Sequence, residues 1–119
     1  MIEFWDRHGQ PVAYVDDDGE SVYLWNGTPC GWISDSGVYA YSGRFLGSFD
    51  DGWVRDLRGS CVFFADDSVG GPVRPVRQVR PVRGVRGVRP VRGVRQVKPV
   101  RPVSSLGWSP LSGDQFFTQ

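Results

Sequence analysis

Residues 20–37, with the sequence ESVYLWNGTPCGWISDSG, contain the pattern on which the first half of the chain is built. A short apolar stretch leads to the dipeptide Asn26-Gly27, a second apolar stretch follows, and the polar turn Ser34–Gly37 ends the unit. Asn-Gly is typical of a tight turn between antiparallel strands, because both of its residues tolerate positive φ. The flanking Val, Tyr, Trp and Ile residues favour strands. The stretch therefore predicts a β-hairpin.

The same unit occurs four times between residues 2 and 68. The copies read IEFWDRHGQPVAYVDDDG, ESVYLWNGTPCGWISDSG, VYAYSGRFLGSFDDG and WVRDLRGSCVFFADDS, with inner turns at Gly9, Gly27, Gly43 and Gly59. A lone hairpin is marginally stable in water, so four of them must bury faces against each other, and closure around an axis limits exposed sheet edges. We therefore expect an all-β domain over residues 1–70, with four β-hairpin repeats in pseudo-four-fold symmetry around a central apolar axis.

Equivalent positions of the four repeats form rings around such an axis. Three residues beyond each inner glycine stands a medium-sized apolar residue, and two residues further on, on the same strand face, three of the four residues are aromatic. We interpret the first ring as the lining of an apolar channel that can hold an extended ligand such as an acyl chain; an ordinary packed core is the alternative. The candidate ligand-binding residues are Val12, Cys30, Leu46 and Val62 in the ring, and Tyr14, Trp32 and Phe64 at the mouth.

The sequence resembles the four-fold beta-flower family in these hairpin units, in the passage Tyr23–Ile33, and in Asp51–Asp56 with Gly59 and Cys61–Phe64. A Pro-rich basic tail that ends in an aromatic segment adds to the resemblance, which covers most of the chain. The resemblance implies a shallow, pseudo-four-fold symmetric β structure with an apolar central channel and no established biochemical role. The first copy departs from the pattern, because Asp6-Arg7-His8-Gly9 replaces the Asn-Gly type of turn.

The formal net charge of +1 hides a division of the chain into an acidic and a basic part. Residues 1–70 hold four basic and twelve acidic residues, and residues 71–119 hold ten basic residues against one acidic residue, Asp114. The two parts therefore carry formal charges of −8 and +9. Charges of opposite sign in one chain favour contact between its two parts.

The basic part is a triplet repeat over residues 71–104. Valine stands at every third position from Val73 to Val103, a basic residue follows each valine up to Val100, and the third place is Pro, Gly or Gln. A period of three fits polyproline II, whereas the prolines block a helix and a strand would scatter the valines over both faces. The basic residues are Arg74, Arg77, Arg80, Arg83, Arg86, Arg89, Arg92, Arg95, Lys98 and Arg101.

Three arrangements of this tail are open. It can be a strap around the acidic domain with its valines inward and its arginines at the acidic turns, a free arm that binds nucleic acid or an anionic membrane, or a contact between subunits. We favour the strap. Ordering the backbone of the strap costs about as much free energy as valine burial and exposed ion pairs contribute. A strap therefore needs backbone hydrogen bonds or an anchor at its end. The aromatic segment 105–119, with Trp108, Phe116 and Phe117, is a candidate anchor.

Nothing in the sequence indicates catalysis or a bound metal. His8 is the only histidine, and one histidine cannot supply a typical zinc site. Cys30 and Cys61 lack CxxC spacing, and they differ by one position in the repeat, so they should point to opposite faces. No Gly-x-Ser-x-Gly, phosphate loop or dinucleotide fingerprint occurs. We therefore predict a non-enzymatic binding module without a cofactor, whose partner is an elongated apolar molecule or a protein. The alternative is nucleic-acid or anionic-membrane binding through the basic tail.

The same sequence suggests a location for the protein. Residues 1–7 lack a basic region followed by an apolar stretch, and no stretch approaches the ~18 apolar residues that cross a bilayer. Two cysteines are too few for a disulfide scaffold. We expect a reducing, cytoplasmic setting.

Overall fold

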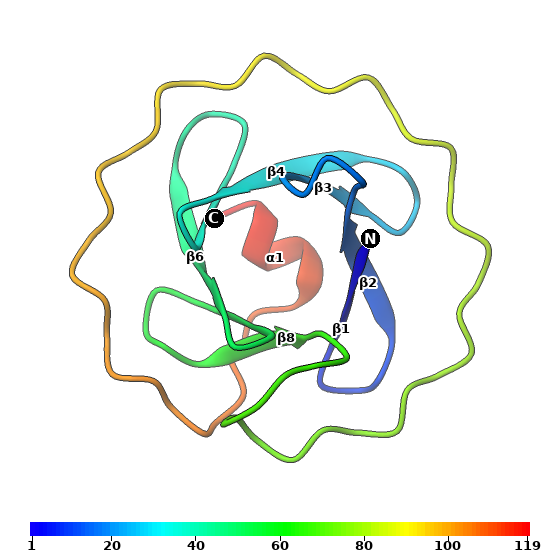
Figure 1. Cartoon of the computed structure of the whole chain (residues 1–119), viewed down its shortest axis with the longest axis vertical. Coiled ribbons are helices and arrows are strands. Elements are labelled where there is room, and N and C mark those ends of the chain that lie inside the picture. Colours follow the sequence, from blue (N-terminus) through cyan, green and yellow to red (C-terminus); the bar gives the residue numbers. More distant parts are fainter.

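The computed structural model describes residues 1–119 and contains a closed barrel of eight antiparallel strands (Figure 1). Each strand pairs with the next one along the chain, and Trp5 of the first strand lies opposite Phe64 of the last, which closes the barrel. This confirms the predicted all-β fold of four hairpins. The strands are β1 (Ile2–Trp5), β2 (Pro11–Val15), β3 (Ser21–Leu24), β4 (Pro29–Ser34), β5 (Gly37–Tyr39), β6 (Phe45–Asp50), β7 (Trp53–Arg55) and β8 (Cys61–Phe64), and the single helix is α1 (Gly113–Phe117).

The four inner turns share one geometry. In each, the glycine has a φ between 75° and 94°, and its N–H donates to the carbonyl three residues earlier at 2.9–3.1 Å. The first turn follows this rule although it lacks Asn-Gly: the N–H of Gly9 donates to the carbonyl of Asp6 at 3.0 Å. The turn geometry therefore depends on glycine at the fourth position and tolerates different residues before it.

Each hairpin carries a β-bulge directly after its inner turn. Between β3 and β4, Val22 lies opposite Gly31 and Tyr23 lies opposite Pro29, so that Cys30 has no partner across the ladder. A bulge breaks the alternation of side chains along a strand. The residues three and five positions beyond the glycine therefore do not share a face. The bulged residues of the four hairpins are Val12, Cys30, Leu46 and Val62.

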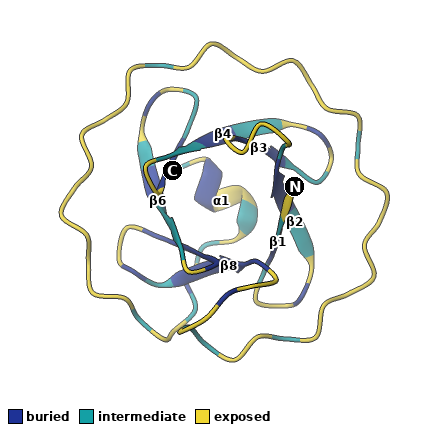
Figure 2. Cartoon of the chain, viewed as in Figure 1, coloured by how far each residue is buried: buried dark blue, intermediate teal, exposed yellow.

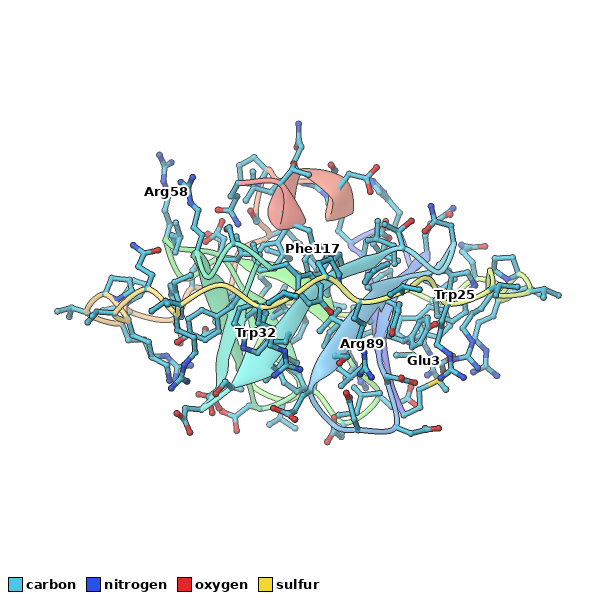
Figure 3. All side chains as sticks on the ribbon, turned by 90° about the horizontal axis from the view of Figure 1, so that it is seen from above. Glu3, Trp25, Trp32, Arg58, Arg89 and Phe117 are labelled. Carbon is cyan, nitrogen blue, oxygen red and sulfur yellow. The ribbon has the colours of Figure 1, made fainter.

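Apolar side chains fill the interior of the barrel, and α1 covers one of its two ends (Figures 1 and 3). The rings of Phe116 and Phe117 pack against Phe63, with centroids 5.7 and 5.8 Å apart. The predicted anchor therefore lies in the barrel core. The core cluster contains Phe4, Ala13, Val15, Val22, Val38, Leu46, Val54, Val62, Phe63, Ala65, Phe116 and Phe117.

Residues 72–105, which we call the strap, run once around the outside of the barrel before the chain turns inward to α1 (Figure 1). The strap forms neither helix nor strand, and most of its residues are exposed (Figure 2). The molecule is a disc of about 37 × 36 × 22 Å, with the strap at its edge.

The prediction that the valines of the strap face inward is wrong. Every valine from Val73 to Val103 is between 85% and 96% exposed. The strap faces the barrel with its backbone instead, and at Gly84 and Gly93 it lies too close to the inner turns for any side chain. The arginines reach the acidic residues from a second face, so the valines are left on the face toward solvent.

Candidate functional site

The strap is held on the barrel by backbone hydrogen bonds that repeat every nine residues. At four third-place positions the N–H group donates to the carbonyl of an inner-turn glycine. The donors are Gln78, Gly87, Gln96 and Ser105, and the acceptors are Gly9, Gly27, Gly43 and Gly59, at N···O distances of 2.8, 2.8, 2.8 and 3.1 Å. Three triplets of the strap, or nine residues, thus correspond to one hairpin of the barrel. Proline has no N–H and cannot stand at these positions, so the order of Pro, Gly and Gln in the third place carries a signal that our sequence analysis missed.

Two glycines of the strap touch the barrel most closely. The N–H groups of Gly84 and Gly93 donate to the carbonyls of Trp25 and Tyr41, at 2.9 and 2.7 Å. A Cβ atom on Gly84 would overlap the carbonyl oxygen of Asn26, and Gly93 is equally close to the carbonyl of Ser42. This contact excludes valine from positions 84 and 93.

All ten basic residues proposed to bind a polyanion contact the barrel. Seven arginines form ion pairs with barrel carboxylates, and their side chains are 37–56% exposed. Such half-exposed pairs contribute at most ~1 kcal/mol each. The pairs are Arg77–Asp66, Arg80–Glu3, Arg86–Asp16, Arg89–Asp18, Arg92–Glu20, Arg95–Asp35 and Arg101–Asp50. Arg74 bonds to the carbonyl of Asp66, Arg83 lies over the ring of Tyr14, and Lys98 bonds to the carbonyl of Asp35.

Asp18 is the best-bound carboxylate of this set. It accepts hydrogen bonds from the hydroxyl of Ser21 at 2.6 Å and from the backbone N–H groups of Glu20 and Ser21, and it pairs with Arg89 at 2.7 Å. Desolvation raises its pKa, but these bonds and Arg89 outweigh that effect and lower the pKa of Asp18 to about 2. The carboxylate therefore fastens the strap to the turn between β2 and β3.

The predicted ring of Val12, Cys30, Leu46 and Val62 packs in or against the core cluster, at the end of the barrel that α1 covers. The backbone of Gly113 lies so close to Val12 that a Cβ atom would overlap the valine side chain. The side-chain amide of Gln119 donates to the carbonyl of Leu46 at 3.2 Å. The apolar neighbour of this ring is therefore the C-terminal segment of the same chain.

The three aromatic residues expected at the mouth of a channel lie on the outer face of the barrel. The ring of Tyr14 stacks on Tyr23 with a centroid distance of 5.7 Å, and the guanidinium of Arg83 from the strap lies 4.7 Å from the Tyr14 centroid. Trp32 has the same surroundings between Tyr39 and Arg92. Placing these residues on the face of the ring was wrong, because the bulge turns the ring residue inward and leaves its neighbour two positions on facing outward.

Phe64, the third of these aromatic residues, belongs to a second apolar cluster on the outer face. The ring of Phe64 packs against Trp53 and Trp108, with centroids 6.0 and 6.3 Å apart. Buried Cys61 lies in this cluster, whereas Cys30 packs against the core inside the barrel. The two thiols thus lie on opposite faces, as their positions in the repeat predicted.

The end of the barrel opposite α1 is open. A depression of about 740 Å³ lies there, with an apolar floor that includes Ile2, Ile33, Phe49 and Ala65. Ile33, Phe49 and Ala65 occupy equivalent positions, six residues beyond the inner glycines. Carboxylates of the acidic turns, among them Asp51 and Asp67, surround the floor. Figure 3 shows α1 on one side of the disc and the side chains of Glu3 and Arg89 on the other. Our sequence analysis missed this second ring because it followed only the positions three and five residues beyond each glycine.

The single histidine and the two cysteines lie in different parts of the barrel. His8 is exposed in the first inner turn. Burial raises the pKa of both Cys30 and Cys61, which keeps the thiols protonated at neutral pH. No three His, Cys, Asp or Glu side chains are grouped so that they could hold a metal ion. The one helix, α1, is too short to cross a membrane.

One family model matches the chain, over residues 2–117, and its description is "4-fold beta flower protein". No curated protein and no solved structure matches.

Proposed function

This chain belongs to the 4-fold beta flower protein family, and we propose that it is a non-enzymatic binding module that accepts an elongated apolar group at the open end of its barrel. The observation that carries the proposal is the depression of about 740 Å³ over the ring of Ile33, Phe49 and Ala65. Its volume lies within the ~300–1,000 Å³ of small-molecule sites. This end of the barrel has an apolar surface that is free for the ligand we expected along the axis, and this supports the proposal.

The floor of the depression continues into the aromatic core. The ring of Phe49 packs edge-on against Phe4 at 5.2 Å, and Phe4 stacks on Phe63 at 6.0 Å. An apolar group seated in the depression would therefore rest on apolar surface, with the filled interior of the barrel beneath it. Because α1 closes the other end, such a ligand enters and leaves from one side only.

A binding role without catalysis fits the chemistry of the chain. The depression is lined by apolar residues, one serine, one glycine and carboxylates, and its lining contains neither histidine nor cysteine. Its carboxylates Asp51, Asp66 and Asp67 lie in exposed turns, outside the apolar setting typical of a carboxyl that acts as a general acid. These features support a module that holds a ligand and does not transform it.

Polyanion binding through the basic tail is the second candidate, and it has weaker support. A nucleic acid or an anionic membrane would have to displace the barrel carboxylates from Arg77, Arg86 and Arg89, among others. Those carboxylates belong to the same molecule and compete at a high effective concentration.

The test uses the full chain and 1-decanol, an uncharged apolar probe, followed by amide chemical shifts. We expect saturable shifts at Ile33, Phe49 and Ala65. Ile33→Ser removes apolar floor and should weaken binding about tenfold, from roughly 1.5 kcal/mol of lost apolar contact. Val79→Ser, on the exposed face of the strap, should leave the affinity unchanged. Absence of saturable binding, or shifts confined to α1 and Leu46, would overturn the proposal.

A further inference from the structure

The outer face of the barrel carries one cross-strand pair at each of four equivalent places. Three of the pairs consist of two aromatic residues, and the fourth does not. The pairs are Tyr14 opposite Tyr23, Trp32 opposite Tyr39, Phe64 opposite Trp5, and Ser48 opposite Arg55. The third hairpin thus has a serine where the other three have a ring.

The strap repeats an arginine over these pairs at intervals of nine residues. Arg83 lies 4.7 Å from the ring centroid of Tyr14, and Arg92 lies 5.2 Å from that of Trp32. The next arginine in this series is Arg101, for which the equivalent barrel position holds Ser48 in place of a ring, and it pairs with Asp50 at 2.5 Å. The third hairpin therefore has the arginine of the strap but lacks the aromatic ring on which it would stack.

A cavity of about 110 Å³ lies at this same place, between the barrel and the strap. Phe45, Ser48 and Leu57 line it from the barrel, and the strap segment from Lys98 to Pro102 closes it from outside. The first and second hairpins have Tyr14 and Trp32 at the position of Ser48. Because Ser48 borders the cavity, we expect an aromatic side chain at position 48 to reach into it.

We propose that this cavity binds a small, uncharged aromatic molecule with a single ring. An apolar cavity of about 150 Å³ in another protein is known to hold benzene, so a volume near 110 Å³ is of the right order for one ring. The cations of Lys98 and Arg101 border the cavity and complement the negative face of an aromatic ring. Asp35, a residue with a largely exposed carboxylate, also lines the cavity and can accept a hydrogen bond from a ring hydroxyl.

This site is separate from the open end of the barrel. Ser36 is the one residue that lines both, whereas Phe45, Ser48 and Leu57 line only the cavity, and Ile33 and Phe49 line only the depression. The inference therefore goes beyond the proposed function, and each can fail without the other.

Phenol is the probe, and cyclohexanol is the non-aromatic comparison of similar size. In the full chain we expect phenol to shift the amide signals of Phe45, Ser48 and Leu57 with a millimolar Kd, and cyclohexanol to bind several-fold more weakly. Ser48→Phe supplies the missing ring and should lower phenol affinity at least tenfold while raising the melting temperature. Ser48→Leu fills the cavity with a smaller side chain and serves if the phenylalanine does not fit.

Ser104→Phe is the matched control, because Ser104 is exposed and does not line the cavity. It should bind phenol within twofold of the unchanged chain. Three results would overturn the proposal: no phenol binding, equal affinity for cyclohexanol, or undiminished phenol binding in a folded Ser48→Phe or Ser48→Leu variant.

Discussion

The guanidinium of Arg55 donates a hydrogen bond of 2.6 Å to the carbonyl oxygen of Ser105, the last residue of the strap. The same guanidinium also donates to the carbonyls of Gly59, at 2.8 Å, and Gly70, at 3.5 Å. Gly70 lies just before the strap, so one buried arginine ties both ends of the ring to the fourth inner turn. At the equivalent position the other repeats have aromatic residues, namely Trp5, Tyr23 and Tyr39.

Arg55→Met should release both ends of the strap from the fourth inner turn. The substitution removes charged donors from three carbonyls in a buried place, and hydrogen bonds to charged groups contribute ~1.5–3 kcal/mol. We expect the free energy of unfolding in urea to fall by about 2–3 kcal/mol. Trypsin cleavage after Arg77 in the strap should become faster. Arg58→Met, at an exposed position of the same turn, should change neither measurement.

Gln78→Pro should loosen the strap at the first hairpin. The substitution deletes the N–H that donates to the carbonyl of Gly9 at 2.8 Å and leaves that carbonyl without its partner. The expected loss in unfolding free energy is about 1 kcal/mol. Gln78→Ala keeps the N–H and is the control. An equal loss in both variants would mean that the side chain, and not the backbone bond, holds the strap here.

The combined substitution Val82→Ser, Val85→Ser and Val88→Ser should be nearly neutral. These side chains are 94–96% exposed, so the change removes no buried apolar surface. We expect unfolding free energies within about 0.5 kcal/mol of the unchanged chain for each site. Val38→Ala in the core should cost roughly 2 kcal/mol in the same urea experiment. A large loss in the triple variant would place the valines against the barrel.

Asp18 should make the stability depend on pH in acid solution. Its pKa is about 2 in the folded chain, below the ordinary value of 3.8 expected after unfolding. Its contribution is therefore complete above pH ~5 and is lost as the pH falls from about 4 to 2. Asp18→Asn should be less stable than the unchanged chain at pH 6, and the difference should disappear near pH 2. Urea titrations across this range measure it, with exposed Asp17→Asn as the control.

The sequence contained enough to predict the hairpins and their closure. Glycines at 9, 27, 43 and 59 set the turns, and the flanking apolar residues set the strands. The expectation that Cys30 and Cys61 lie on opposite faces was also confirmed, because both residues keep their positions in the repeat.

The face of the strand on which each side chain lies was predictable only in part. Strict alternation would put Tyr14 on the same face as Val12, but a bulge at Val12 separates them. A bulge depends on how the partner strand pairs, and a single sequence does not display that pairing. The open end over Ile33 and Phe49 was missed for the related reason that it depends on which end α1 covers.

By itself, the sequence determined a four-hairpin barrel and a tail with three distinct faces, because turn residues, strand residues and a period of three act locally. Only the tertiary structure decided which face of the tail meets the barrel. The backbone of the strap lies within hydrogen-bonding distance of the inner turns: third-place N–H groups donate to turn carbonyls, and Gly84 and Gly93 leave no room for a side chain on that side. The valines point outward for this reason, although their hydrophobicity alone favours the opposite direction.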